Sequence, residues 1–169
     1  PESPDDSASG SARGLGDILL RAKYHWVKSD QHNLAVALQM KSATGDEDDF
    51  LGTGEATVRP LLIYSRTFGS FTPHLNLGYE FNLDDSDQNS LEYAAGFDVG
   101  TENVTFALSV LGSREASGDG IGDTIVSAGA GLKWNPFGSY IFTGNLLVPL
   151  NDDGLRSDLI TTLAFERNF

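Results

Sequence analysis

The chain has 169 residues and no cysteine, so disulfide bonds and thiolate metal sites are excluded. Its formal net charge of -13 disfavours nucleic acid as a partner, because a phosphate backbone requires a basic surface. No run of apolar residues approaches the roughly 18 that a membrane-spanning helix needs. The 19 Gly and 10 Phe are instead typical of turns and strands, so we expect an all-β chain.

Residues 1–13 are rich in Ser, Gly, Pro and Asp and have no periodicity, which predicts an exposed extracellular loop or tail. From residue 14 to residue 169, apolar residues alternate with small or polar ones in nine segments. This alternation predicts strands with two different faces. The predicted strands fall at 17–26, 33–41, 57–65, 73–83, 91–99, 104–111, 126–135, 139–151 and 158–169.

The two faces of these strands differ in chemistry. In the segment 73–83, for example, Leu75, Leu77 and Tyr79 alternate with Asn76 and Gly78. Small residues interspersed with charged ones are expected where strands line a wet lumen. The predicted lumen-lining residues are Arg21, Lys23, His25, Gln39, Lys41, Arg59, His74, Glu80, Glu92, Asp98 and Lys133.

The connections between the predicted strands alternate in length. Short turns at 28–33, 68–71, 100–103 and 135–139 alternate with longer polar loops at 44–55, 84–90, 113–122 and 151–157. Outer-membrane barrels have this asymmetry, with short periplasmic turns and long extracellular loops.

Bulky aromatic residues gather beside the short turns, and the chain ends on an aromatic residue. Rings at one depth are typical of the girdle at a membrane interface, although hairpin aromatics also pack the cores of soluble proteins. The predicted girdle residues are Tyr24, Trp26, Tyr64, Trp134, Tyr140 and Phe169.

These features predict an antiparallel up-and-down transmembrane β-barrel formed by residues 14–169, in the bacterial outer membrane, with lipid and lipopolysaccharide around it. Bacterial barrels normally have an even number of strands and both termini in the periplasm. We therefore expect this chain to be the C-terminal part of a 10- to 12-stranded barrel. Its remaining N-terminal strands would be cleaved away, supplied by another chain or unobserved. The alternative is a closed nine-stranded barrel.

Four segments carry a family resemblance: GLGDILLRAKYHW (14–26), ATGDEDDFLGTGE (43–55), PHLNLGYEF (73–81) and NLLVPLNDDGLRSDL (145–159). They resemble the family of outer-membrane transporters associated with phenol meta-cleavage pathways. The similarity spans most of the chain from residue 14. Ala43 stands where many members have Pro, a difference at a loop entry. The resemblance implies passage of small, often aromatic or hydrophobic, compounds through the outer membrane.

The charges on the predicted lumen side have two interpretations. Basic residues on the first three segments, such as Arg21 and Arg59, would form a wall beside acidic residues on the next two, such as Glu80 and Glu92. Opposed walls could orient a polar solute in a pore. Alternatively, the same charges neutralise one another in a structural network.

No catalytic residue, cofactor or metal site is predicted. Asp46, Asp48 and Asp49 could gather Ca²⁺ or Mg²⁺, but their loop lacks the order of an EF-hand, so solvated carboxylates are the favoured interpretation. Ser65 and His74 could approach one another across neighbouring strands, yet catalysis needs a nucleophile, a base and an orienting group together. We therefore expect that the chain is not an enzyme.

Three functions stay open from the sequence. The first is a channel or transporter that passes small molecules by diffusion through a polar lumen. The second is a structural or surface-binding outer-membrane barrel with a plugged lumen, and the third is a soluble β-barrel that binds a hydrophobic ligand.

Overall fold

The computed structural model describes residues 13–116, 124–153 and 157–167, and these residues form one antiparallel sheet of nine strands. Each strand pairs with the next in the chain, in the order β1 to β9, which confirms the predicted all-β, up-and-down arrangement. The strands are β1 (Leu19–Lys28), β2 (His32–Lys41), β3 (Thr57–Arg66), β4 (Phe71–Asn82), β5 (Ser90–Gly100), β6 (Val104–Glu115), β7 (Thr124–Trp134), β8 (Tyr140–Pro149) and β9 (Ile160–Arg167).

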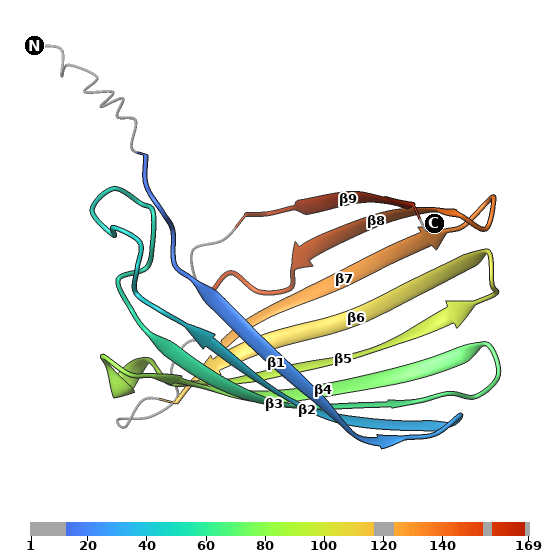
Figure 1. Cartoon of the computed structure of the whole chain (residues 1–169), viewed down its shortest axis with the longest axis horizontal. Helices are drawn as coiled ribbons and strands as arrows, with labels where there is room; N and C mark the ends of the chain where they lie inside the picture. Colours follow the sequence, from blue (N-terminus) through green and yellow to red (C-terminus); the bar gives the residue numbers. More distant parts are fainter. Residues whose placement is uncertain (1–12, 117–123, 154–156, 168–169) are drawn as a thin grey trace, which may run out of the picture.

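The sheet curls across its width from β1 through β4 to β9 (Figure 1). Its edges are β1 and β9, and the described residues of these two strands do not pair with each other. The predicted additional strands stay a prediction. Residues 1–12 of the predicted extracellular loop or tail, which spans 1–13, lie outside the described residues.

The connections confirm the alternation of lengths that the sequence predicts. Short turns join β1 to β2, β3 to β4, β5 to β6 and β7 to β8 at one end of the sheet, on the right in Figure 1. Gly69 and Gly138 adopt φ angles of 62° and 74° in two of these turns, a left-handed conformation that glycine adopts without steric cost. The longer connections lie at the opposite end, and one of them holds a 3-10 turn, η1 (Ser86–Gln88).

One irregularity differs from the sequence prediction. The pairing of β1 with β2 shifts between His25 and Val27, so that Val27 rather than Trp26 lies opposite Leu34. Trp26 is thus the extra residue of a β-bulge, which simple alternation cannot reveal because it assumes one unbroken register.

The buried side chains lie on one side of the curved sheet. Within the described residues, the register places all of them on the face that carries the predicted lumen residues: Ala35, Ala37, Gln39, Thr57, Asn82, Ser127 and Ile141. Crowding on this face is expected on the concave side of a curled sheet. We call it the polar face and the opposite one the apolar face.

No helix in the described part of the chain has the length and apolar character that crossing a membrane would require.

Candidate functional site

The polar face holds every predicted lumen-lining residue. Arg21 lies opposite Gln39, Lys23 opposite Ala37 and His25 opposite Ala35, so all share the face of the buried residues. The register places the other predicted residues on the same face: Lys41 of β2, Arg59 of β3, His74 and Glu80 of β4, Glu92 and Asp98 of β5, and Lys133 of β7. Alternation therefore assigned the common face correctly.

Charge pairing links the basic side of the polar face to the acidic side. The Arg59 guanidinium donates hydrogen bonds from Nη1 to both carboxylate oxygens of Glu92, and its Nε lies 3.9 Å from Oε2 of Glu80. The three side chains are about one quarter exposed or less, with values of 20%, 26% and 27%. This geometry favours mutual neutralisation over two separate charged walls.

A missing side chain allows this pairing across an intervening strand. Arg59 lies on β3 and Glu92 on β5, and Gly78 of β4 lies directly opposite Glu92. A Cβ at Gly78 would lie 3.3 Å from Cγ of Leu61 and 3.4 Å from the carbonyl oxygen of Pro60. Gly78 therefore leaves space above β4 where the Arg59 side chain crosses this strand.

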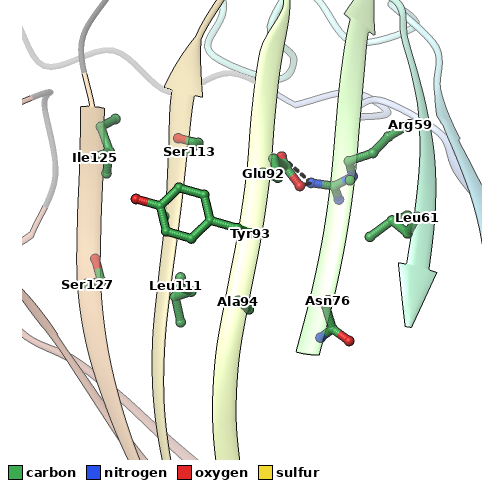
Figure 2. A pocket seen from close by; sticks show the side chains of 12 residues that line it. Arg59, Leu61, Asn76, Glu92, Tyr93, Ala94, Leu111, Ser113, Ile125 and Ser127 are labelled. Atoms are coloured by element: carbon green, nitrogen blue, oxygen red, sulfur yellow. Dashed lines mark hydrogen bonds and ion pairs between the residues drawn. The ribbon is translucent and has the colours of Figure 1, made fainter. Parts of the chain in front are cut away.

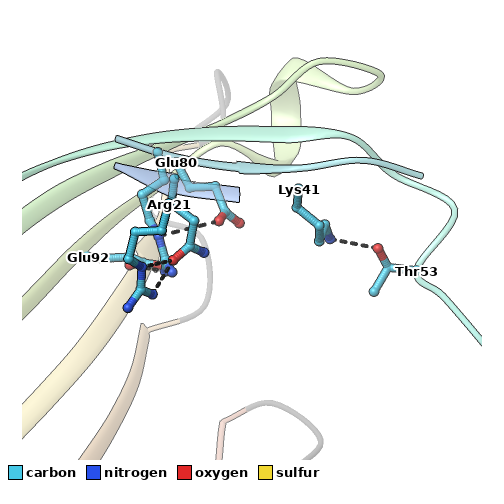
Figure 3. A network of polar contacts seen from close by, with 7 residues as sticks. Arg21, Lys41, Thr53, Glu80 and Glu92 are labelled. Carbon is cyan, nitrogen blue, oxygen red and sulfur yellow. Dashed lines mark hydrogen bonds and ion pairs between the residues drawn. The ribbon is translucent and has the colours of Figure 1, made fainter. Parts of the chain in front are cut away.

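Further polar contacts lie on β1 and β2, next to the Arg59 group (Figure 3). Arg21 donates from Nε to Oε1 of the buried Gln39, at 3.0 Å, and Gln39 lies opposite Arg59 in the sheet. Farther along β2, Lys41 donates to the Thr53 hydroxyl at 2.6 Å. The alternation of residues in the sequence predicts Gln39 on the lumen side but does not give its partner, because the partner depends on the register.

A second polar pair lies nearer the short-turn end of the sheet. His74 Nε2 and Asp98 Oδ2 are 2.8 Å apart, and both side chains are well exposed. Ser65 lies opposite His74, as the sequence suggested, but no hydrogen bond joins these two among the residues described. The geometry that nucleophilic catalysis needs is therefore not assembled here. That the chain is not an enzyme stays a prediction.

The polar face contains a hollow beside the Arg59–Glu92 pair (Figure 2). Its volume is about 370 Å³, within the range of small-molecule sites. Side chains from five strands, β3 to β7, surround it. The lining residues are Arg59, Leu61, Asn76, Gly78, Glu92, Tyr93, Ala94, Leu111, Gly112, Ser113, Ile125 and Ser127. Of these, Tyr93 and Gly112 belong to the apolar face by register.

The apolar face carries the predicted girdle. Tyr24, Tyr64, Trp134 and Tyr140 point away from the polar face by register, and all lie near short turns. Trp26 lies at the bulge and is 68% exposed, while Phe169 lies outside the described residues.

Aromatic contacts form a continuous cluster across β7, β8 and β9. The ring centroids of Trp134 and Phe142 are 5.8 Å apart, those of Phe142 and Phe165 are 5.1 Å apart, and Phe165 stacks on Tyr140 at 5.9 Å. Aromatic pairs of this kind contribute about 0.5–1.5 kcal/mol each beyond the area that they bury. Tyr79 and Phe81, with ring centroids 4.7 Å apart, form a second aromatic pair toward the long-loop end of β4. Neither residue belongs to the predicted girdle.

Charges on the apolar face occur only near the ends of strands. In the described strands they are three arginines: Arg66 at the end of β3, Arg114 one residue before the end of β6, and Arg167 at the end of β9. Arg66 stacks over Phe68 with its Cζ 4.4 Å from the ring centroid, and Arg167 lies over Tyr140 at 5.5 Å. No acidic residue lies at an apolar-face position of these strands.

Asp17 organises the long loop between β2 and β3. Its carboxylate accepts hydrogen bonds from the backbone N–H groups of Thr53 and Gly45, each at 2.9 Å, and from the Thr53 hydroxyl at 3.2 Å. The Thr53 amide, followed by the Gly45 amide, lowers the pKa of Asp17 below its ordinary value, and partial desolvation opposes this change. Gly45 and Gly52 meet so closely that a Cβ on either would collide with the backbone of the other.

The acidic residues of that loop do not form a metal site in the structure. Asp46 accepts a hydrogen bond from the backbone N–H of Asp48 at 3.1 Å, which is a local turn contact. Across the described residues, no three His, Asp or Glu side chains come together as a metal site would require. The loop also holds Phe50 in the left-handed region, with φ of 57°, and nearly fully exposed.

The fold and the two faces define a class of protein: an antiparallel up-and-down β-sheet whose one face is polar and hollowed and whose other face is apolar. The chain belongs to the family described as "Putative MetA-pathway of phenol degradation", whose model matches residues 2–152. This agrees with the resemblance seen in the sequence, and it connects the chain with phenol degradation. None of the curated proteins matches it.

Proposed function

We propose that this chain forms the wall of an outer-membrane β-barrel through which small molecules, among them aromatic or hydrophobic ones, diffuse along a polar lumen. The observation that carries the proposal is the distribution of charge between the two faces. Charged side chains occur along the polar face, whereas the charged residues on the apolar face of the described strands are arginines near strand ends.

Lipid explains the apolar face better than a soluble core does. A core would bury its large apolar side chains, yet Leu77, Leu108 and Leu146, in the middle of their strands, are each about half exposed. A contiguous exposed apolar surface is typical of membrane or protein contact. Arginines near strand ends reach the headgroup region at little cost, and the aromatic residues beside the short turns suit the same interface.

The polar face suits a water-filled path. On this face Arg59 is paired with Glu92, and small residues such as Gly78, Ala94 and Gly129 leave room beside the larger side chains. Paired charges let water and uncharged solutes pass without the strong field of a single-sign pore. The proposal includes further strands, from this or another chain, that close the barrel between β1 and β9, because exposed edges promote aggregation.

The test is planar-bilayer conductance of protein purified in detergent from outer-membrane fractions, with intact mass measured on the same sample. We expect discrete conductance steps, and a mass larger than 18.1 kDa or a co-purifying chain that supplies the closing strands. Membrane association without conductance would support a plugged structural barrel instead. A homogeneous, electrically silent protein that stays monodisperse without detergent would overturn the membrane assignment.

A further inference from the structure

The hollow on the polar face is lined by both apolar and polar side chains. Leu61, Leu111 and Ile125 line it together with the hydroxyl-bearing Ser113 and with Asn76. Figure 2 shows these side chains on neighbouring strands, with the Arg59–Glu92 pair at one side. Small-molecule sites have this character, mainly apolar with a few placed polar groups.

Charge at the hollow is already matched. Arg59 is paired with Glu92 and lies close to Glu80, and the nearby Arg21 is held by Gln39. An ionic solute would lose hydration on entering without gaining an unpaired counter-charge from the lining. The hollow therefore favours uncharged solutes over anions and cations of the same size.

Two polar atoms at the hollow lack hydrogen bonds within the described part of the chain. They are Nε of Arg59, a donor, and Oδ1 of Asn76, an acceptor, and both are shielded from water. A buried polar atom without a partner costs about 1–3 kcal/mol. A hydroxyl group both donates and accepts, so it can supply the missing partner to either atom after a small side-chain adjustment.

We propose that this hollow is a solute-binding subsite for small, uncharged, mainly apolar molecules that carry a hydroxyl group. The inference rests on the proposed function, because it treats the hollow as a binding site on the lumen wall. It goes further by naming the chemical class that binds and the side chains that recognise it: Asn76 contacts the hydroxyl, and Leu61, Leu111 and Ile125 contact the apolar body.

The test uses three matched probes, benzyl alcohol, toluene and benzoate, added to the whole protein in lipid nanodiscs. Binding is followed by backbone amide NMR shifts, with Ala94 and Ser113 as reporters because both line the hollow. We expect saturable shifts with benzyl alcohol and at least about tenfold weaker binding of benzoate, a difference of about 1.4 kcal/mol. Equal affinity for benzyl alcohol and benzoate, or shifts spread evenly over the apolar face, would overturn the proposal.

Two pairs of variants separate recognition from general damage. Asn76→Leu should remove the preference for benzyl alcohol over toluene, while Asn145→Leu, on the polar face of β8 outside the hollow, should keep it. Ala94→Leu should fill the hollow and weaken benzyl alcohol at least about tenfold. Ala107→Leu, a polar-face alanine outside the hollow, should not. Unchanged binding in both hollow variants would contradict the assignment.

Conductance measured on the same preparations tests the channel separately from the subsite. If the wild-type protein conducts but benzyl alcohol causes no localised, saturable shift, the channel stands and the subsite fails. If benzyl alcohol binds at the hollow but no conductance is seen, the subsite stands and the channel fails.

Discussion

Charge is distributed differently on the two faces of the sheet. On the polar face, charged side chains occur along the strands, from Arg21 near the start of β1 to Asp98 near the end of β5. On the apolar face of the described strands, charge occurs only at Arg66, Arg114 and Arg167, each within one residue of a strand end. In the described strands, charge therefore also lies in the interior of a strand on the polar face, as at Lys23 in the middle of β1, but only near strand ends on the apolar face. A low-dielectric layer against the apolar face would impose this rule, because the cost of an arginine in a bilayer depends on depth.

The largest effect is expected where this rule is broken in the middle of the sheet. Leu108 lies on the apolar face of β6 and is 51% exposed. In a bilayer, Leu108→Arg should lower the free energy of unfolding by about 2–4 kcal/mol, the cost of arginine near the midplane. Urea titration in lipid vesicles measures the change.

The adjacent residue supplies the matched control. Ala107 lies on the polar face, opposite Asp98 on β5 and Gly131 on β7. Ala107→Arg therefore gains an acidic neighbour and open space, and should change stability by less than about 1 kcal/mol. Equal destabilisation by the two substitutions would show that the faces do not meet different solvents.

The second effect concerns the paired charges of the polar face. Glu92→Gln leaves Arg59 with the more distant Glu80 alone, so we expect the free energy of unfolding to fall by about 1.5–3 kcal/mol, the range for a hydrogen bond to a charged group. Glu166→Gln is the control, because Glu166 lies on the polar face of the edge strand β9. If Glu92→Gln has no more effect than this control, the Arg59–Glu92 contact does not stabilise the wall. A double-mutant cycle with Arg59→Met isolates the coupling between the pair.

A smaller effect is expected at the margin of the apolar face. Arg66 stacks over Phe68, an arrangement worth about 0.5–1 kcal/mol at an exposed site. Arg66→Ala should lower stability in vesicles by about that amount, and the loss should vanish when Phe68 is already alanine. A loss that persists without Phe68 would assign Arg66 another partner, such as a lipid headgroup.

Period-2 alternation was sufficient to predict the faces but not the contacts. It assigned Arg59, Glu92, His74 and Asp98 to one face because a strand's side chains alternate strictly as long as the register is unbroken. The pairing of Arg59 with Glu92 could not be predicted, because it crosses β4 and depends on the registers of two hairpins. The bulge at Trp26 was missed for the same reason. The role of Asp17 was also missed, because its amide partners lie 28 and 36 residues away in a loop.

The last prediction concerns this loop, where little global stability is at stake. Asp17→Asn replaces the carboxylate that accepts the Gly45 and Thr53 amides by a weaker neutral acceptor, so hydrogen exchange of those two amides should accelerate while exchange within the strands stays unchanged. Asp49→Asn, an exposed carboxylate of the same loop, is the control.

The pH dependence follows from the lowered pKa of Asp17. A carboxyl whose pKa is lower in the folded state stabilises the loop fully above the ordinary value of about 3.9, and this contribution is lost as the pH falls through the lower folded value. Wild-type protection of Gly45 and Thr53, corrected for intrinsic exchange, should therefore approach that of Asp17→Asn only in acid. If wild type and variant already coincide at neutral pH, Asp17 does not anchor the loop. Since the loop lies at the long-loop end of the sheet, beyond the strands, the loss should leave the contrast between the two faces intact.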